Sequence, residues 1–227
     1  MAHKHTKQNG ASPNQRSPKT KSKVHYSIQD LQEIAAQHPS DTSWTYTLLQ
    51  ETFPFEYQAK IEIIHDQLHI MPNPSEWHQD IVLKLATVLK SFVKKNKLGK
   101  IIIVPFDVYL DENNVFSPDI LYISLSRKEI LDGKRALGAP DMVVEVISPA
   151  NYKKLREEKK EIYAQFGVQE YWEIYPKKQK CLVYVLQEGK LVAHKPSENP
   201  DLVKSYLLEG FELNIKTFFQ ELLTEDF

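Results

Sequence analysis

The sequence predicts an α/β (α+β) fold in which helices flank a mixed central β-sheet. Three observations carry this prediction. A long stretch with helical periodicity is followed by three strand-like segments, and these by a second helical stretch and two more strands. A hydrophobic content of 41% in 227 residues is enough for a substantial core. No segment after residue 25 has the composition of a linker, so one domain is expected rather than two.

The N-terminal segment differs from the rest in charge, because basic residues but no acidic residue precede Asp30. The basic residues are Lys4, Lys7, Arg16, Lys19, Lys21 and Lys23. We predict a disordered basic tail over residues 1–25, which attracts phosphates or only aids solubility, and one domain over residues 26–227. Without these six charges the net charge falls from −1 to about −7, which is unlike a typical DNA-binding surface.

Several classes of protein are excluded by what the sequence lacks. No apolar run reaches the roughly 18 residues of a membrane helix, and the first 25 residues contain no apolar stretch of the kind found in signal peptides. The single cysteine, Cys181, excludes an internal disulfide and a cysteine-based zinc site. We therefore expect a cytoplasmic protein that does not contact membranes, with Cys181 as a small core residue.

The elements are expected in the following order. Ser27, with Asp30 three residues later, begins a short helix. YQAKIEII and QLHIM form two strands joined by a tight turn at His65-Asp66. Ser75 caps a long helix that ends near Leu98-Gly99 and has one apolar face. That face consists of Trp77, Ile81, Leu85, Val88, Leu89 and Phe92.

The central strands are expected in IIIVPFDVYL, VFSPDILYIS and DMVVEVIS. The turn at residues 111–114, with the sequence DENN, joins the first two as a hairpin. A helix from about Tyr152 to Phe166 follows, and then the strands EYWEIY and CLVYVL. Together these elements form one mixed sheet with helices packed against it.

Three carboxylates occur where buried residues are expected. Glu145 lies inside an apolar strand, Asp119 follows Pro118, and the hairpin register places Asp107 opposite Pro118 or Asp119. Carboxylates brought together in this way repel unless a cation lies between them, and oxygen-only ligands suit Mg²⁺ or Mn²⁺. Each carboxylate also has an ordinary structural explanation. Glu145 would form a salt bridge or lie at a strand end open to solvent, and Asp119 would belong to a simple turn. Asp107 would cap the hairpin or face solvent.

A lysine and a histidine also point inward. On the helix KKLREEKKEIYAQF, Lys159 lies in the middle of the apolar face, whereas Lys160 points away. A lysine in that position pairs with a carboxylate or a metal-bound anion, or it extends along the apolar surface to water. His78 falls on the inward face of its long helix, where a histidine is more often a core residue than a functional one.

Residues from about Tyr57 to Leu186 resemble the Uma-type putative restriction endonucleases, which are abundant in cyanobacteria and belong to the PD-(D/E)xK nuclease superfamily. The matching segments are IEIIHDQLHIMPNPSEWHQ, VPFDVYLDENNVFSPDILYIS, GAPDMVVEVISP and EKKEIYAQFGVQEYWEIYP. The third of these, followed by K-x-x-x-Y-x-x-x-G-V-x-E-Y-W, is a specific signature. The resemblance implies a restriction endonuclease-like core, a divalent metal and hydrolysis of nucleic acid, with DNA as the expected substrate.

The resemblance assigns residues to the family's motif. Asp119 corresponds to the aspartate of PD, and Glu145 to the acidic residue of (D/E)xK. The lysine usually found two places later is absent, because Ile147 stands there, and the corresponding lysine is Lys159 on the following helix.

The same resemblance implies roles for further residues. Glu62 and His78 stand where the family commonly has Glu and His, and they join Asp107 as accessory candidates. As a hypothesis, Asp119, Glu145 and the backbone carbonyl of Val146 hold Mg²⁺ or Mn²⁺ in a magnesium-dependent endodeoxyribonuclease.

Two departures from the family pattern favour alternatives. Leu155 replaces an aspartate that family members usually carry four residues before the helix lysine, and Asp66-Gln67 replaces their Gly-Glu. One alternative is a catalytically inactive nucleic-acid-binding or assembly protein on the same fold. Another is a metal-dependent hydrolase with a different substrate. Many enzymes of the superfamily act as dimers, so a homodimer is possible, with Trp172 as a candidate interface residue.

Overall fold

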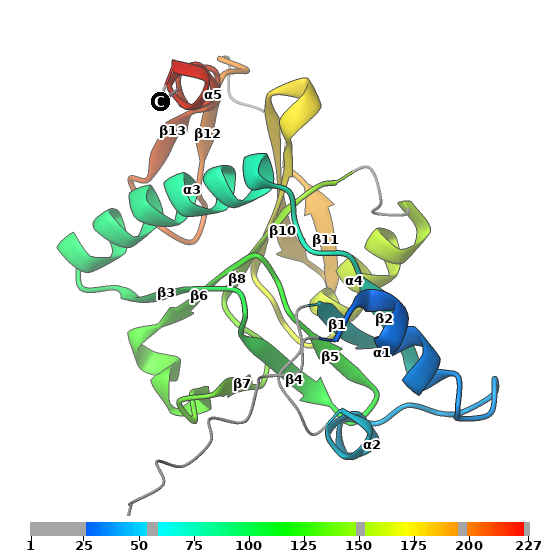
Figure 1. Cartoon of the computed structure of the whole chain (residues 1–227). Coiled ribbons are helices and arrows are strands. Elements are labelled where there is room, and N and C mark those ends of the chain that lie inside the picture. The colour runs from blue at the N-terminus through cyan, green and yellow to red at the C-terminus, as the bar shows by residue number, and fades with distance from the viewer. Residues whose placement is uncertain (1–25, 54–58, 149–152, 195–198, 225–227) are drawn as a thin grey trace, which may run out of the picture.

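The computed structural model describes residues 26–53, 59–148, 153–194 and 199–224 and shows helices packed against two large mixed sheets (Figure 1). The predicted mixed α/β fold is therefore confirmed. The helices are α1 (Ile28–Ala35), α2 (Tyr46–Thr52), α3 (Glu76–Lys95), α4 (Lys153–Gln165) and α5 (Ile215–Thr224). Short 3-10 helices are η1 (Leu125–Ile130) and η2 (Pro176–Lys178). The predicted tail, residues 1–25, lies outside the described residues.

The strands form a five-stranded sheet, a six-stranded sheet and a small pair. The five-stranded sheet runs in the order β2 (Gln67–Met71), β1 (Lys60–Ile64), β5 (Asn114–Phe116), β4 (Asp107–Asp111) and β7 (Arg135–Leu137). The six-stranded sheet runs in the order β11 (Lys190–Ala193), β10 (Lys180–Gln187), β9 (Glu170–Tyr175), β8 (Met142–Val146), β6 (Ile120–Ser124) and β3 (Gly99–Ile103). The pair consists of β12 (Leu202–Lys204) and β13 (Glu212–Asn214). The β4–β7 and β8–β9 pairs are parallel, and the other pairs are antiparallel.

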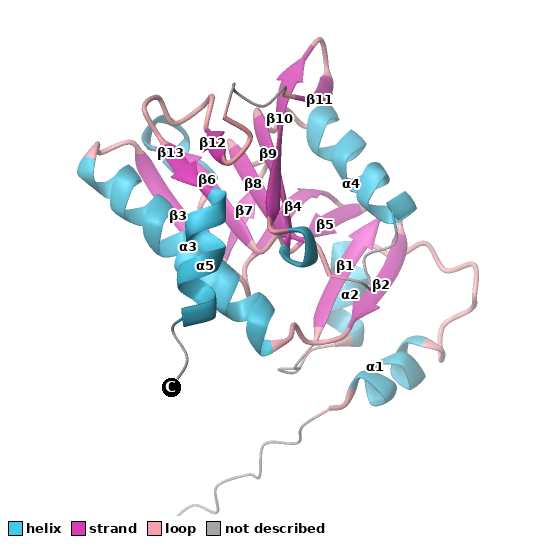
Figure 2. Cartoon of the chain, turned by 90° about the horizontal axis from the view of Figure 1, so that it is seen from above, coloured by secondary structure: helices cyan, strands magenta, loops and turns pink. Residues whose placement is uncertain are grey.

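Three apolar clusters hold these layers together. Figure 2 shows α3 and α5 on one side of the six-stranded sheet and α4 on the other. The largest cluster packs α3 and α5 against one face of the six-stranded sheet and includes Leu85, Trp172 and Phe219. A second cluster packs the opposite face of that sheet against α4 and the five-stranded sheet, and includes Tyr163. A third covers β1 with α1 and α2 and includes Leu31. Because strand side chains alternate between faces, β8 contributes to the first two clusters at once.

Local signals in the sequence form as expected. Ser27 and Asp30 make a reciprocal capping box at the start of α1, and the side chain of Ser75 accepts a hydrogen bond from the backbone N–H of His78 at the start of α3. His65 and Asp66, in the β1–β2 turn, have φ values of 47° and 58°, as a tight hairpin turn requires.

The strands form two large sheets instead of the single sheet expected from the sequence. The segment IIIVPFDVYL divides into β3 and β4, and VFSPDILYIS divides into β5 and β6, with each half in a different sheet. Pro105 and Pro118 lie at these two breaks, where a residue without a backbone N–H cannot continue the hydrogen bonding of a strand. The β4–β5 hairpin thus belongs to the five-stranded sheet, and Asp119 lies where the chain returns to the other.

The described residues include no helix with the length and apolar character needed to cross a membrane.

Candidate active site

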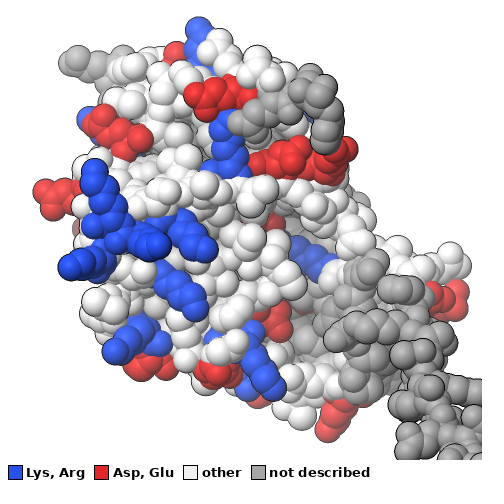
Figure 3. All heavy atoms as spheres, turned by 60° about the vertical axis from the view of Figure 1, so that its left-hand side comes forward, with Lys and Arg blue, Asp and Glu red and all other residues white. Residues whose placement is uncertain are grey.

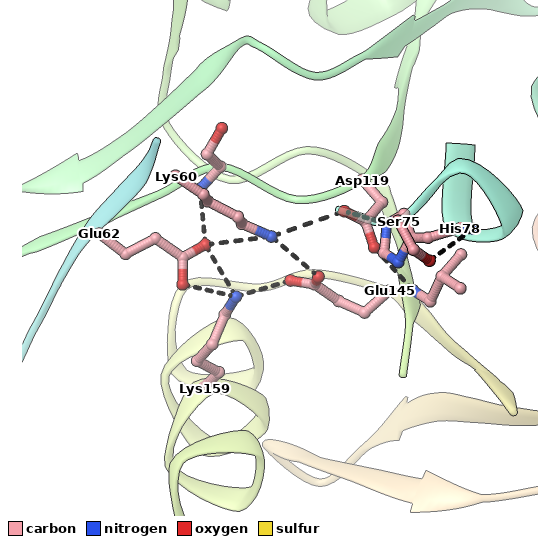
Figure 4. Close-up of polar contacts among 9 residues, drawn as sticks. Lys60, Glu62, Ser75, His78, Asp119, Glu145 and Lys159 are labelled. Carbon is pink, nitrogen blue, oxygen red and sulfur yellow. Dashed lines mark hydrogen bonds and ion pairs between the residues drawn. The ribbon is translucent and has the colours of Figure 1, made fainter. Parts of the chain in front are cut away.

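A cleft of about 1950 Å³ is lined by residues of both large sheets and of the first turns of α3 and α4. Its lining includes five candidate residues from the sequence, and their side chains converge (Figure 4). These are Glu62, His78, Asp119, Glu145 and Lys159. Lys60, which the sequence did not single out, lies among them. We call these six residues the charged cluster.

Glu145 and Asp119 come from neighbouring strands of the six-stranded sheet. On β8, Glu145 shares a face with Val143, which packs toward α4, while Val144 and Val146 pack under α3. Asp119 immediately precedes β6, and its Oδ2 accepts the backbone N–H of Val146 at 2.7 Å. Both carboxylates are only 4% exposed. This hydrogen bond connects Asp119 to the residue that follows Glu145.

Glu62 adds a carboxylate from the five-stranded sheet. It lies on β1, is 1% exposed, and accepts the backbone N–H of Ser117 at 2.9 Å. Ser117 is part of the segment through which the chain leaves that sheet for β6. Glu62 therefore helps to fix the crossover that positions Asp119.

Lys159 links the two sheets. Its Nζ donates to Glu145 Oε1 at 2.7 Å and to both carboxylate oxygens of Glu62 at 2.9 and 3.0 Å. The helical periodicity correctly placed this lysine toward the core, where it is 7% exposed. The prediction that Lys160 points away was wrong, since β10 and β11 cover that side of α4. Lys160 is 8% exposed, with its Nζ 2.9 Å from Glu157 Oε2 and 4.1 Å from the ring centre of Tyr184.

His78 reaches the cluster from the first turns of α3. Its Nε2 lies 3.2 Å from Asp119 Oδ1, so the imidazole lies against one oxygen of the carboxylate while the Val146 N–H donates to the other. The cap at Ser75 fixes the start of this helix and hence the place of His78.

Lys60 was missed by the sequence reasoning. Its Nζ lies 3.4 Å from Glu145 Oε2, 3.6 Å from Asp119 Oδ1 and 3.7 Å from Glu62 Oε1. The signal was present, because Lys60 and Glu62 are two residues apart in a short apolar strand and so share a face. Two charged residues on one face of such a strand indicate an ion pair at the interface of two layers.

Asp107 lines the cleft but stands apart from the charged cluster. Its side chain accepts a hydrogen bond from the hydroxyl of Tyr46, which donates to Oδ2 at 3.5 Å. The expected pairing with Asp119 was wrong, because the β4–β5 register ends at Val108 and Phe116 before the chain changes sheet. Leu155 also lines the cleft.

Comparison with known proteins identifies the family. The family model Uma2, described as "Putative restriction endonuclease", matches residues 46–216, which is most of the chain. The chain belongs to the Uma2 family. A crystal structure of a putative nuclease belonging to DUF820 from Anabaena variabilis ATCC 29413 has a similar fold, with a TM-score of 0.62 and 24% sequence identity. That match covers 71% of this chain and 90% of the other. No curated protein matches this chain.

The three buried carboxylates of this Uma2 site differ in the direction in which their pKa values are shifted. Burial raises the pKa of Asp119, but Lys60, His78 and the Val146 N–H outweigh it and lower the pKa to about 2. Burial likewise opposes ionisation of Glu62, yet Lys159 and Lys60 bring its pKa below the ordinary value. For Glu145, burial dominates over both lysines and the pKa is raised. Asp119 and Glu62 therefore keep their negative charge to a lower pH than Glu145 does.

The side chains of this Uma2 site have the chemistry of a divalent-metal site, but two ammonium groups stand among them. Oxygen donors from Glu62, Asp119 and Glu145 surround Lys60 Nζ, and such donors suit Mg²⁺ or Mn²⁺. As these side chains lie, no three His, Cys, Asp or Glu residues in the described ranges are close enough to hold a metal. The donor set therefore fits an ion provided that the Lys60 ammonium moves aside.

The expectation of a Trp172 interface is not met in this Uma2 chain. Trp172, on β9, is fully buried under the helices that cover this face of the six-stranded sheet, and its Nε1 donates to Glu170 Oε1. Strand β9 is interior to the six-stranded sheet, which accounts for the burial of both Trp172 and its neighbour Tyr171. A dimer of this protein would use other residues.

Proposed function

We propose that this protein is a metal-dependent endonuclease that hydrolyses phosphodiester bonds of DNA. The observation that carries the proposal is the convergence of Glu62, Asp119, Glu145 and Lys159 at one cleft, contributed by both sheets and α4. Membership of a family described as putative restriction endonucleases supports the same reaction class. The cleft volume exceeds the roughly 300–1,000 Å³ typical of small-molecule sites, which suits a polymeric substrate.

In this proposal Asp119 and Glu145 hold Mg²⁺ or Mn²⁺, together with the backbone carbonyl of Val146. When bound, such an ion lowers the pKa of a water molecule and offsets the charge of the phosphate. The oxygen of the attacking water bonds to phosphorus and gives up a proton, while one ester P–O bond breaks and its electron pair leaves with the departing oxygen, which takes up a proton to become a hydroxyl.

The chain's own residues then have distinct tasks. Lys159, held by Glu62 and Glu145, orients the attacking water and offsets the negative charge that develops on the phosphate. His78 and the Val146 N–H fix the orientation of Asp119. Lys60, once displaced from between the carboxylates, has the charge and reach to contact a phosphate at the cleft.

The test is cleavage of supercoiled plasmid and single-stranded DNA with Mg²⁺ or Mn²⁺ by wild type and Glu145→Gln. The substitution keeps the size of the side chain and removes its charge, so we expect metal-dependent cleavage in wild type and none in the variant. Glu129→Gln, at an exposed position on η1, is the matched control and should cleave like wild type. Unchanged cleavage by a folded Glu145→Gln protein would refute the assignment.

A second candidate function is that of an inactive nucleic-acid-binding or assembly protein. The specific observation in its favour is that Lys60 and Lys159 lie within ion-pair distance of all three carboxylates, so two of the three negative charges are already offset by side chains of the chain itself. The departure at Leu155 points the same way. Isothermal titration with Mn²⁺ separates the two functions, because millimolar or tighter binding that Glu145→Gln abolishes is expected only of the enzyme.

A further inference from the structure

The long helix α3 and the loop after it carry an unusual concentration of positive charge. The whole chain has 29 basic and 30 acidic residues, yet residues 81–106 contain lysines and no Asp or Glu. These lysines are Lys84, Lys90, Lys94, Lys95, Lys97 and Lys100. All except Lys84 are exposed. Figure 3 shows basic side chains gathered on the side of the molecule that carries the end of α3 nearest β3.

A stripe on α3 connects this charge to the candidate active site. Leu83, Thr87, Lys90 and Lys94 are spaced by four, three and four residues and therefore share one side of the helix. All four are exposed, and Leu83 also lines the cleft. At 1.5 Å per residue the stripe is about 17 Å long. Its first residue, Leu83, lines the cleft, and its last two residues, Lys90 and Lys94, are positively charged.

Structural roles do not account for these lysines. Lys94 and Lys95 lie in the last turn, where positive charge stabilises the helix dipole, but Lys90 is a turn earlier and Lys97 and Lys100 lie outside the helix. Among the described residues, none of the five exposed lysines forms an ion pair, although acidic residues are as numerous as basic ones in the chain. Their charge is left available to an external anion.

We propose that this stripe, with Lys97 and Lys100 at its far end, is a docking surface for the phosphate backbone of duplex DNA. The proposal rests on the proposed function, because it assigns the path of that enzyme's substrate. Since each strand of a duplex rises about 3.4 Å per nucleotide, the stripe spans about five base pairs. No member of the stripe is aromatic, so stacking on unpaired bases does not contribute. The contacts are electrostatic and independent of sequence.

The experiment measures binding by fluorescence anisotropy with a labelled duplex of about 20 base pairs, in EDTA so that no cleavage occurs, over a series of salt concentrations. Lys90→Gln/Lys94→Gln removes two phosphate contacts. The slope of log K against log[salt] should fall by about 2, and binding at about 0.1 M salt should weaken roughly tenfold or more. Binding should weaken equally for unrelated duplex sequences.

The matched control is Lys190→Gln/Lys216→Gln, which changes the net charge equally. Both lysines are exposed: Lys190 lies on β11, the edge strand opposite β3, and Lys216 lies in the first turn of α5, five residues before the Glu221 that pairs with Lys84. This variant should bind like wild type. Equal weakening by both pairs, no effect of the α3 pair, or no duplex binding by wild type would overturn the proposal. The proposal would also be overturned if wild type bound phosphatidylserine vesicles but not DNA, and if Lys90→Gln/Lys94→Gln weakened that vesicle binding.

Failure of the docking surface is distinguishable from failure of the proposed function. Wild type that binds duplex through Lys90 and Lys94 but cleaves no DNA with Mg²⁺ or Mn²⁺ would support the surface and refute the nuclease. Cleavage by wild type together with unchanged binding by the lysine variant would support the nuclease and refute the surface.

Discussion

Replacing Lys60 with Met removes the ammonium group from between three carboxylates and keeps a side chain of similar length. Lys60 Nζ lies 3.4–3.7 Å from oxygens of Glu145, Asp119 and Glu62. A divalent ion held by the same oxygens would compete with it. The substitution should therefore have opposite effects on two quantities, lowering the stability of the metal-free protein and raising its affinity for metal.

The distances set the size of these effects. With an effective dielectric constant of about 20, each contact contributes roughly 4–5 kcal/mol of attraction before desolvation is subtracted. Removing one partner of a buried ion pair costs about 3–5 kcal/mol. Because the side chain is 21% exposed, we expect a loss near the lower end, about 3 kcal/mol. A metal ion at about 100 times its Kd would return about 2.7 kcal/mol, so saturating ion should restore most of the loss.

The assay is urea unfolding in EDTA and in Mg²⁺, combined with isothermal titration of Mn²⁺. We expect the metal Kd of Lys60→Met to be at least tenfold lower than that of wild type. Lys84→Met is the control, because Lys84 is 16% exposed and pairs with Glu221 at 3.2 Å outside the site. It should lose stability without gaining metal affinity. Competition between Lys60 and the metal is refuted if Lys60→Met binds metal no more tightly than wild type, or if the variant is as stable as wild type in EDTA.

Two further predictions concern stability. Ser75→Ala removes the N-cap of α3 and should lower the free energy of unfolding by about 1 kcal/mol in urea denaturation; an unchanged midpoint would contradict the cap. Glu170 has a pKa raised by burial, so its contribution to stability is fully present below its unfolded pKa and is lost as pH rises through the folded pKa. The stability advantage of wild type over Glu170→Gln, measured in urea, should therefore be larger near pH 4 than near pH 7, whereas an advantage that grows with pH would show that the pKa is lowered instead.

Local patterns allowed much of the fold to be predicted. The periodicity of α3, the caps at Ser27 and Ser75, and the turn at His65-Asp66 are all read from neighbouring residues, and the structure has them. The division into two sheets depends on non-local pairing. Pro105 and Pro118 marked the breaks, but strand composition alone does not show that the segments on either side join different partners.

The candidate site was predictable to the extent that its residues interrupt apolar patterns. Glu145 and Lys159 stood out in this way, and they form an ion pair at 2.7 Å. Lys60 did not stand out by itself, and its signal was only the spacing of two residues from Glu62, which places both charges on one face of the strand. Asp107 was wrongly placed beside Asp119, because the register of the β4–β5 hairpin was extended past the point where the hairpin ends.

The placement of the charged cluster at the meeting point of the two sheets has a consequence for how the protein can evolve. Lys159 joins Glu62 of the five-stranded sheet to Glu145 of the six-stranded sheet, and Lys60 makes the same connection from β1. The side chains proposed to cleave DNA therefore also connect the five-stranded sheet to the six-stranded sheet. A descendant that lost cleavage would still lose stability if one of these groups were removed alone, because its buried partners would be left without their counter-charge.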